Sequence, residues 1–457
     1  MYGVSYDLDR LGWLQFQQLC AHVLELEAGV APAEWEGDAD ECRFVAADDG
    51  VGPPLLQAPM SGPVLVQCAW LRPGATAPLT MALEALTARH AERLRGLRSY
   101  VLMANGEQVA AGSSRAAGDL RVEVVDSPTL SARIDARPEL RLAMPSLLGV
   151  RDLDPLIGSA VAARSTLDRD EAEPLAGVFV GTRAYARSVR TLHEHRFAVL
   201  TGPPEMGKTA IARMIGLAKM TDGWEAHECT SPDQMLASFD PQAAQVFIAD
   251  DAFGSTEYRA DAAERWARAM ERLLDALDDR HWLVWTSRPA PLHAALHRLH
   301  QERGAERFPA PARVLVDASI LDTEEKVLIL YRHAKAAELP LDTRRALTRC
   351  GPAIVARPTF TPERIRRLVV RLSRGDRSVT RAADVELTTP TDAMMTSFGA
   401  LSEEHRDVLV ALLDTPPGPV PERELVSALR RHHDGSLSRP PVHLVDRLAD
   451  HFLRVSA

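Results

Sequence analysis

The chain has 457 residues, which corresponds to about three domains of ordinary size. Hydrophobic residues make up 46% and charged residues 25% of it, a mixture that excludes a wholly disordered chain, a collagen-like chain and a coiled coil. Because 53 basic residues stand against 63 acidic ones, the net charge is −10, and general attraction to nucleic acid is not expected.

The sequence shows no segment suited to a membrane or to export. No apolar run approaches the roughly 18 residues that a membrane-spanning helix needs. The N-terminus lacks a basic segment followed by an apolar core. The five cysteines are scattered and never spaced as Cys-x-x-Cys, which argues against a disulfide framework or a zinc site. We therefore expect a cytoplasmic protein without a membrane partner.

Lysine is rare in this chain. It occurs only at Lys208, Lys219, Lys326 and Lys335, so arginine supplies the other 49 basic residues. Since arginine serves wherever a general positive charge is enough, a lysine kept inside a motif is informative. A motif that lacks its lysine is informative for the same reason.

Residues 1–150 are predicted to form a mixed α/β domain. Apolar residues at helical spacing indicate the first helix, and short β-rich runs indicate the strands. The expected elements, in order, are a helix over residues 8–23, strands at Cys42–Ala47 and Val64–Trp70, a helix over Leu79–Leu97, and strands at Tyr100–Ala104 and Leu120–Val125.

From residue 176 onward, strands and helices alternate, which predicts a parallel sheet with helices on both faces. Residues 151–175 precede this region as a connecting helix or a linker. The expected elements of the alternating region are Arg196–Leu200, Lys208–Ala218, Val246–Ala249, Ala260–Leu277 and Trp282–Thr286. Beyond residue 320 the pattern becomes helical, with helices expected at Glu324–Ala337, Pro362–Ser373, Leu401–Leu413, Glu422–His432 and Val442–Phe452.

One segment fits the phosphate-binding pattern G-x-x-x-x-G-K-[ST] completely. It reads Gly202-Pro203-Pro204-Glu205-Met206-Gly207-Lys208-Thr209, and it follows an apolar strand and precedes a helix. Glycines let the backbone wrap the phosphates, and amide groups at a helix N-terminus stabilise their negative charge. Lys208 is then expected to reach the β- and γ-phosphate oxygens of ATP, and Thr209 to present its hydroxyl to Mg²⁺.

About 40 residues later, an apolar strand ends in two carboxylates, Asp250 and Asp251. Ligands bind at the carboxyl ends of strands in open α/β sheets. Asp250 is expected to hold Mg²⁺ and Asp251 to polarise the attacking water. A third strand, ending at Thr286, is followed by Arg288, whose permanent charge is expected to contact the γ-phosphate. If each feature is considered alone, the alternative for the two aspartates is a solvated turn, and the alternative for Arg288 is a surface arginine.

Together, three segments resemble the STAND class of P-loop ATPases, in particular the prokaryotic STAND group of predicted antiviral and conflict systems. They are Gly202–Thr209, the run Asp250-Asp251-Ala252-Phe253-Gly254, and the run Thr286-Ser287-Arg288-Pro289. The resemblance covers about residues 178–375 and, less fully, 391–457. It implies an NTPase core, a helical lid and a winged-helix domain. In this class nucleotide exchange drives oligomerisation and switches on an N-terminal effector.

The resemblance gives each expected part of the chain a role. Residues 1–150 are an α/β domain, 151–175 a linker, 176–320 the P-loop NTPase core with its parallel sheet, 321–390 the helical lid, and 391–457 a winged-helix-like domain. Within the lid, Thr361–Arg366 would open a helix with Arg364 or Arg366 facing the nucleotide, and Cys350-Gly351-Pro352 would form a turn against adenine. Ordinary helix capping, with proline in the first turn, is the alternative.

The chain departs from this class in two respects. STAND proteins usually carry a long sensor array after the winged helix, whereas this sequence ends at Ala457 without one. We therefore expect either a separate sensor or effector protein, or a shortened product. The class also commonly uses a winged-helix histidine to sense ADP, and the sequence does not choose among His432, His433, His443 and His451.

The order of elements in residues 1–125 resembles Mrr-like restriction endonucleases. That chemistry needs an acidic residue, matched here by Asp40, and then (Asp/Glu/Gln)-x-Lys on a neighbouring strand. The matched positions hold Gln67 and Ala69, so alanine stands where lysine belongs. Residues 1–150 also carry 12 arginines against 19 acidic residues, a net −7 that repels DNA. We expect a nuclease-like fold that has lost catalysis, with an unrelated α/β module as the alternative.

The sequence thus predicts a slow, Mg²⁺-dependent ATPase that binds ATP and ADP. The resemblance to STAND proteins implies a signalling switch that forms a homo-oligomer in the ATP state, in antiphage defence. The alternative is an ATP-dependent DNA-binding regulator that reads a groove with its C-terminal winged helix. That alternative needs a basic recognition helix, and residues 425–434 offer only Arg430 and Arg431 as a cluster.

Overall fold

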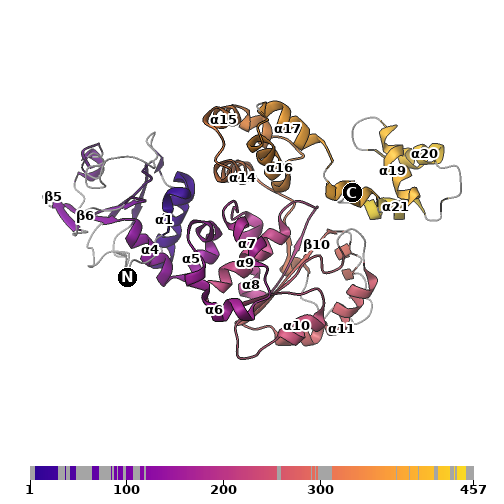
Figure 1. Ribbon diagram of the computed structural model, residues 1–457, viewed down its shortest axis with the longest axis horizontal. Helices are drawn as coiled ribbons and strands as arrows, with labels where there is room; N and C mark the ends of the chain where they lie inside the picture. The colour runs from indigo at the N-terminus through magenta and orange to yellow at the C-terminus, as the bar shows by residue number, and fades with distance from the viewer. Residues whose placement is uncertain are drawn as a thin grey trace. The chain divides into compact units, whose positions relative to one another are not determined.

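The computed structural model divides the chain into two compact units, Met1–Ile157 and Gly158–Ala457 (Figure 1). The residues that the structure describes are 6–28, 36–37, 42–47, 64–71, 84, 87–89, 91–95, 99–106, 114–117, 120–254, 259–289, 291–293, 295–296, 311–376, 378–390, 392–399, 401–415, 420–432, 437 and 440–448.

The first unit contains a six-stranded mixed sheet in the order β1-β2-β3-β4-β6-β5. Strand β3 pairs antiparallel with β2 and parallel with β4, and β4 pairs parallel with β6. The strands are β1 (Glu36–Gly37), β2 (Cys42–Ala47), β3 (Val64–Ala69), β4 (Ser99–Ala104), β5 (Ser114–Ala117) and β6 (Leu120–Val125). The helices are η1 (Leu8–Arg10), α1 (Trp13–Ala28), α3 (Ala91–Leu94), α4 (Ser127–Ala136), α5 (Pro138–Ala143), η2 (Pro145–Val150) and α6 (Asp154–Arg164), which crosses the unit boundary.

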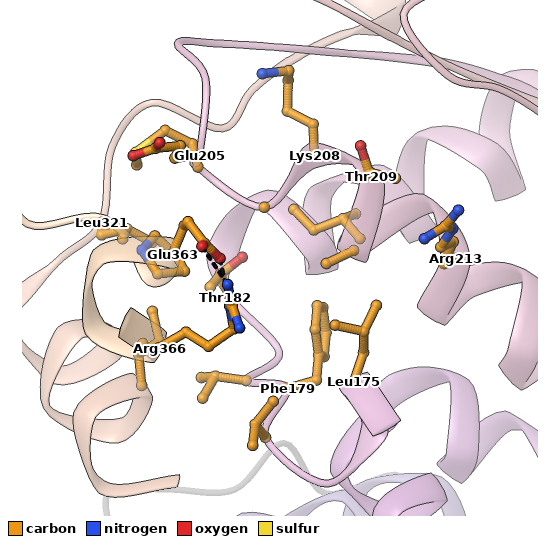
Figure 2. Close-up of a pocket in the computed structure, with 18 of the residues that line it drawn as sticks. Leu175, Phe179, Thr182, Glu205, Lys208, Thr209, Arg213, Leu321, Glu363 and Arg366 are labelled. Carbon is orange, nitrogen blue, oxygen red and sulfur yellow. Dashed lines mark hydrogen bonds and ion pairs between the residues drawn. The ribbon is translucent and has the colours of Figure 1, made fainter. Parts of the chain in front are cut away.

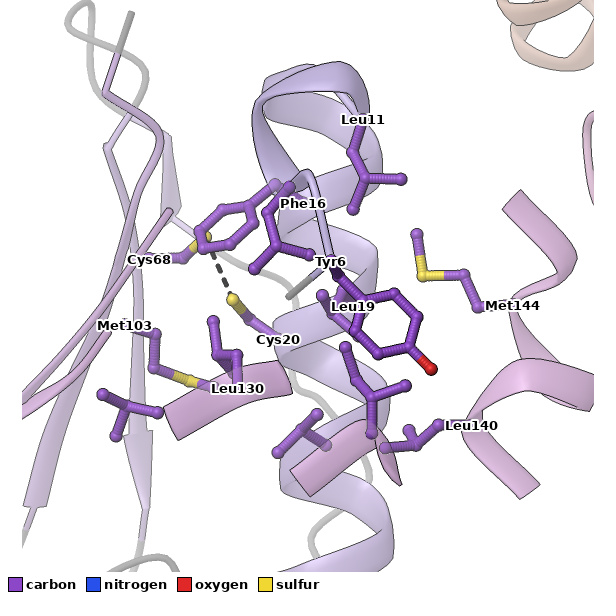
Figure 3. Packing of buried hydrophobic residues seen from close by; sticks show 14 of the residues in the cluster. Tyr6, Leu11, Phe16, Leu19, Cys20, Cys68, Met103, Leu130, Leu140 and Met144 are labelled. Atoms are coloured by element: carbon purple, nitrogen blue, oxygen red, sulfur yellow. Dashed lines mark hydrogen bonds between the residues drawn. The ribbon is translucent and has the colours of Figure 1, made fainter. Parts of the chain in front are cut away.

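Strand alternation builds the core of the first unit. Val66 and Cys68 of β3 point to the face covered by α1, where they pack in one cluster with Phe16 and Cys20 (Figure 3). The sulfur atoms of Cys20 and Cys68 lie 3.6 Å apart in this cluster. Because helix α1 carries an apolar stripe at helical spacing, it buries that stripe against the sheet, as the sequence predicts.

The opposite face of β3 carries the two positions matched to nuclease chemistry. Gln67 is fully buried and accepts a hydrogen bond from the hydroxyl of Tyr100. Ala69 is 2% exposed and packs in an apolar cluster with Tyr100 and Leu94. The acidic residue expected to complete that site, Asp40, lies outside the described residues.

The second unit contains five parallel strands in the order β11-β7-β10-β9-β8, which confirms the predicted parallel sheet. Because β10 lies between β7 and β9, the three strands that the sequence analysis singled out are neighbours. Their carboxyl ends therefore meet at one edge of the sheet. The strands are β7 (Phe197–Thr201), β8 (Glu225–Glu228), β9 (Gln245–Ala249), β10 (His281–Ser287) and β11 (Leu315–Asp317).

Helices cover both faces of this sheet (Figure 1). On one face, Trp266 of α11 packs against Trp285 of β10, with ring centroids 5.1 Å apart. On the other face α9 approaches closely, because a Cβ placed on Gly216 would lie 3.0 Å from Cδ1 of Ile248 in β9. The helices around the sheet are α7 (Arg169–Ala176), α8 (Arg183–His195), α9 (Lys208–Met220), α10 (Pro232–Ser238), α11 (Ala260–Ala276) and α13 (Pro311–Val314).

The remainder of the second unit is helical in the described residues. Helix α14 begins with a capping box, in which Asp322 and Glu325 bond each other's backbone N–H groups. The segment predicted to be a lid, residues 321–390, is called the lid here. Its helices are α14 (Thr323–Ala336), α15 (Leu341–Val355), α16 (Pro362–Ser373) and α17 (Val379–Thr388). They are followed by α18 (Asp392–Gly399), α19 (Glu403–Leu413), α20 (Glu422–His432) and α21 (Pro441–Leu448).

Helices α19, α20 and α21 share a small apolar core that includes Val408, Leu429 and Leu444. No strand is assigned to the described residues between 391 and 448, so the winged-helix-like domain stays a prediction. Across the part of the chain that the structure describes, no helix combines the length and the apolar character that crossing a bilayer requires.

Candidate nucleotide-binding site

The phosphate-binding loop connects β7 to α9, in the strand–loop–helix order that the sequence predicts. Gly202 has φ +148°, and a Cβ there would lie 3.2 Å from the backbone nitrogen of Ser319. Gly207 has φ +87° and immediately precedes Lys208, where α9 begins. Both positions therefore need glycine, the first for close backbone approach as well as conformation. The loop leaves the N-terminus of α9 facing the space in front of it, a position suited to an anion.

Lys208 is 7% exposed and its ammonium group is held by the loop itself. Its Nζ donates to the carbonyl oxygens of Gly202 at 2.8 Å and Pro203 at 2.7 Å. The pKa of Lys208 is lowered to about 8, chiefly by burial and also by the positive charge of Arg288, while Asp251 and Asp250 oppose the shift. Burial of the charged ammonium group therefore costs desolvation free energy. A polyphosphate bound in front of the loop would offset that cost.

The two aspartates after β9 occupy different environments. Asp250 is exposed, and its Oδ1 accepts hydrogen bonds from Thr209 Oγ1 at 2.8 Å and Thr286 Oγ1 at 2.5 Å. Asp251 has φ +45°, a left-handed conformation that is uncommon outside glycine, and its N–H donates to Thr286 Oγ1 at 2.9 Å. Burial, and then the negative charge of Asp250, raise the pKa of the Asp251 carboxyl.

Arg288 follows β10 and lines the same cavity as Lys208 and Asp251. Burial lowers its pKa, and the negative charges of Asp251 and Glu205 partly offset that effect. The structure therefore brings the residues predicted from three separate motifs to one place. A guanidinium group remains fully charged in such a setting, since its pKa is normally above 12.

A cavity of about 440 Å³ lies in front of the loop, within the range of about 300–1,000 Å³ that is usual for small-molecule sites. Lys208 and Thr209 lie on one side of it, and Leu175 and Phe179 on the opposite side (Figure 2). The lid contributes Glu363 and Arg366. One end of the cavity is thus cationic and the other apolar, which matches a molecule with a phosphate chain at one end and an aromatic base at the other.

The lid arginines have distinct positions. Thr361 caps α16 by accepting from the backbone N–H of Arg364 at 3.2 Å. Arg366 lines the cavity and makes a bidentate pair with Glu363, at 2.7 and 2.6 Å. The side chain of Arg364 is instead buried against the phosphate loop, with its Nε 3.9 Å from Oε2 of Glu205.

The prediction of a turn at Cys350-Gly351-Pro352 is wrong, because these residues lie inside α15. Gly351 has no Cβ to clash with the following proline ring, so the helix continues through Pro352. None of the three belongs to the described residues that line the cavity.

Several lining residues have no counterpart in the sequence analysis. The apolar wall formed by Leu175, Val178 and Phe179 precedes α8, and its only sequence signal is a short apolar run beside a predicted linker. His333 of α14 also lines the cavity, and burial, followed by the charge of Arg366, lowers its pKa to about 4. Thr286, quoted only as part of a motif, bridges the two aspartates.

Of the four histidines considered as ADP sensors, the structure describes the side chain of only one. His443 is exposed, while the side chain of His432 and all of His433 and His451 lie outside the described residues.

The hydroxyl of Thr209 and the carboxylate of Asp250 offer the hard oxygen ligands that Mg²⁺ prefers. No group of three or more His, Cys, Asp or Glu side chains suited to a metal occurs among the described residues. This donor set fits a cation held by one or two protein oxygens together with phosphate oxygens and water, the usual arrangement for magnesium at nucleotide sites.

Residues 179–336 match the family model described as novel STAND NTPase 3. No curated protein matches the chain significantly. Among solved structures, a RuvB variant from Thermotoga maritima is 17% identical, with a TM-score of 0.30, over 58% of this chain and 84% of that chain. A Walker-type ATPase of Pyrococcus abyssi is 12% identical, with a TM-score of 0.35, over 64% and 100%. The FIGL-1 AAA domain in complex with ADP is 14% identical, with a TM-score of 0.30, over 52% and 88%.

The family match begins at Phe179 in the cavity wall and ends at the last residue of α14. It therefore includes the phosphate loop, both aspartates and Arg288. These residues therefore lie in the part of the chain that is similar to novel STAND NTPase 3.

Proposed function

We propose that this chain is an ATP-binding, Mg²⁺-dependent ATPase of STAND type that works as an oligomerising signalling switch. The observation that carries the proposal is a single cavity with an apolar wall at its far end. It is lined by Lys208, Thr209, Asp251 and Arg288. Asp250 is joined to it through its hydrogen bond from Thr209. Each of these side chains has the charge or hydrogen-bonding group that phosphoryl transfer to water requires.

The residues divide the chemistry among them. Lys208 exchanges its two carbonyl partners in the loop for β- and γ-phosphate oxygens, and Arg288 contacts the γ-phosphate. Thr209 and Asp250 hold Mg²⁺, which neutralises charge on the phosphates when it is bound. Asp251 accepts a hydrogen bond from the attacking water and takes up its proton, a role that its raised pKa favours. Leu175 and Phe179 exclude water from the base.

Nucleotide binding is tested by calorimetry with ATP and Mg²⁺. Lys208→Ala removes the cation at the phosphates and is expected to abolish binding, whereas Asp251→Asn keeps the phosphate contacts and is expected to preserve it. Unchanged affinity in Lys208→Ala would show that the loop does not bind ATP in the proposed way.

Oligomerisation in the ATP state is the second part of the proposal, and it rests on the resemblance to STAND proteins in antiviral systems. Light scattering after size exclusion, with a non-hydrolysable ATP analogue and Mg²⁺, is expected to show a larger species than with ADP. A role in antiphage defence predicts that Lys208→Ala abolishes protection of a host in plaque assays. A separate sensor or effector protein is expected to co-purify from that host.

A DNA-binding regulator is the competing outcome of the same experiment. A chain that stays monomeric with the ATP analogue, and that binds duplex DNA tightly in a salt-sensitive way, would favour it. The exposed charges of helix α20 are Arg423, Arg430 and Arg431 against Glu422 and Glu424, a net charge of only +1. That charge balance supports the switch over the DNA reader.

For the first unit, a nuclease-like fold without catalysis remains our proposal. In its support, β2 and β3 are antiparallel, β4 is parallel to β3, and Ala69 is buried among apolar side chains where a catalytic lysine would be needed. Incubation of the intact chain with plasmid DNA, Mg²⁺ or Mn²⁺ and ATP is expected to leave the plasmid uncut. Cleavage that disappears in Asp40→Ala would show a working nuclease instead. Ala69→Lys alone is not expected to restore cleavage.

A further inference from the structure

One residue of the phosphate loop has an unusual backbone conformation. Glu205 has φ +68°, in the left-handed region that glycine adopts at little cost and glutamate rarely adopts. It lies two residues before Gly207, in the segment whose amide groups face the phosphate position. A conformation that costs energy persists only where its surroundings hold it in place.

Contacts with the lid hold Glu205 in place. Its side chain is 7% exposed, and its Oε2 lies 3.9 Å from Nε of Arg364, whose own side chain is 5% exposed. The hydroxyl of Thr361 donates to the same Oε2 at 3.5 Å. Both partners belong to the first turn of α16, so one carboxylate of the loop meets the N-terminal end of one lid helix.

Arg364 is also fixed from the lid side. Its Nη1 donates to the backbone carbonyl of Glu386 at 3.0 Å, and its Nη2 lies 3.5 Å from the sulfur of Met394. Burial lowers the pKa of Arg364, and the charge of Glu205 opposes that effect. Breaking the pair would leave a charge buried without its counterion, which is strongly unfavourable.

A carboxylate in a phosphate loop is chemically unexpected, because the loop binds anions. Its repulsion of the phosphates is reduced when its charge is paired and turned away from them. Arg364 provides that pairing when the lid is docked on the loop. Release of the lid would return the carboxylate's full charge to the loop, close to the phosphates.

From this geometry we infer that Glu205 is a positioning residue that latches lid helix α16 to the phosphate loop and thereby slows nucleotide release. The inference rests on the proposed nucleotide-binding function, and it assigns the Glu205 side chain to the lid rather than to the nucleotide. Glu363 and Arg366 of the same helix line the cavity, so release of the latch would free one wall of the site.

The test compares two glycine substitutions in the full chain. Glu205→Gly removes a left-handed glutamate from the loop. Glu338→Gly removes another one, at φ +47°, from an exposed position that does not line the cavity, and serves as the matched control. Both relieve backbone strain, so both are expected to fold at least as well as the parent chain. Only the first breaks the latch.

Hydrogen exchange measures the latch itself without any nucleotide. Amides in the first turns of α16 are expected to exchange about tenfold faster in Glu205→Gly than in the parent chain, a factor that corresponds to about 1.4 kcal/mol. They are expected to be unchanged in Glu338→Gly. Equal protection of α16 in all three proteins would overturn the latch, whether or not the chain binds nucleotide.

Release of a fluorescent ADP analogue measures the consequence. The dissociation rate is expected to rise about tenfold in Glu205→Gly, less in Glu205→Gln, which keeps the acceptor for Thr361 but loses the charge, and not in Glu338→Gly. An unchanged rate in Glu205→Gly would overturn the inference. A parent chain that binds no analogue would refute the proposed function instead, and the exchange result would still decide whether the latch exists.

Discussion

At the scale of single residues, lysine usage separates a chemical role from a packing role. Both lysines of α9 are buried although arginine supplies nearly all other positive charge. Lys208 presents a compact ammonium group to the phosphate position. Lys219 lies over two indole rings, 3.9 Å from the centroid of Trp224 and 4.6 Å from that of Trp282, a cation–π arrangement. The sequence predicts that a retained lysine matters, but it does not distinguish these two reasons.

The buried cation of the phosphate loop gives a stability prediction. Its folded-state pKa of about 8 lies below its usual value of 10.5, so the folded protein bears the full desolvation cost below pH 8. Lys208→Met is therefore expected to raise the free energy of unfolding of the nucleotide-free protein at pH 7 by about 1–3 kcal/mol. The advantage over the parent chain should shrink between pH 8 and 10.5, as the parent's folded-state lysine loses its proton.

Denaturant unfolding at pH 7 and pH 9.5 measures this difference. Lys335→Met is a suitable control, because Lys335 is only partly buried and lies in α14, outside the phosphate loop. If Lys208→Met were destabilised equally at both pH values, burial of the ammonium group would not destabilise the nucleotide-free protein.

The attacking-water residue gives a prediction on rate. Asp251→Asn is expected to lower ATP turnover by about 100-fold or more while ATP affinity stays close to that of the parent chain. Because the pKa of Asp251 is raised, its carboxylate form is lost at a higher pH than that of an exposed aspartate. As pH falls, kcat/KM of the parent chain should therefore decline earlier than an exposed carboxylate would cause. A profile with the same acidic limb in Asp251→Asn would assign that limb to another group.

At the scale of secondary structure, elements with a strong local pattern were predictable. Helix α9 and strand β9 differ from their predicted bounds by only one or two residues, and α16 and α20 match theirs. Strand β8 was missed because three of its four residues, Glu225, His227 and Glu228, are polar, and the first two are buried by a polar network that no periodicity reveals. Strand β11 was missed because it has three residues and pairs with a distant β7.

Close packing of the phosphate-loop helix on the sheet gives a prediction at this scale. Gly216→Val is expected to lower the free energy of unfolding by about 1–3 kcal/mol, because its added atoms meet Ile248 and Leu167. Ala186→Val, on the exposed face of α8, is the control and should change stability by only a few tenths of a kcal/mol. Thermal unfolding of both variants measures the difference in stability. Equal melting temperatures would mean that α9 can shift away from β9 without cost.

At the scale of the whole molecule, the candidate site was predictable only where its residues belong to motifs. The sequence places Lys208 after a strand and a loop, and Asp250 and Arg288 directly after strands, and the parallel strand order brings the three together. It does not reveal which lid arginine meets the cavity, since that depends on how α16 packs. Nor does it reveal the apolar wall at Leu175 and Phe179, because no local pattern connects that wall to a loop some thirty residues later.

The division of the chain into two compact units gives a prediction about which of them binds ATP. Among the described residues, those that line the cavity all lie from Leu175 to Arg366, within the unit Gly158–Ala457. A chain beginning at residue 158 is therefore expected to bind ATP with the affinity of the full chain. Calorimetry on both proteins is the measurement, with circular dichroism to check folding. A well-folded shorter chain with much weaker binding would show that the first unit contributes to the nucleotide site.

The scarcity of lysine also makes the phosphate loop open to chemical footprinting. An amine with a pKa of about 8 has a far larger unprotonated fraction near neutral pH than an ordinary lysine, and only the unprotonated form attacks an acylating reagent. With four lysines in the chain, mass spectrometry can follow acylation of each one separately. A small amine-reactive ester should mark Lys208, and bound nucleotide should protect it while Lys326 and Lys335 continue to react. Loop occupancy could thus be read directly in crude extracts, without purification or an activity assay.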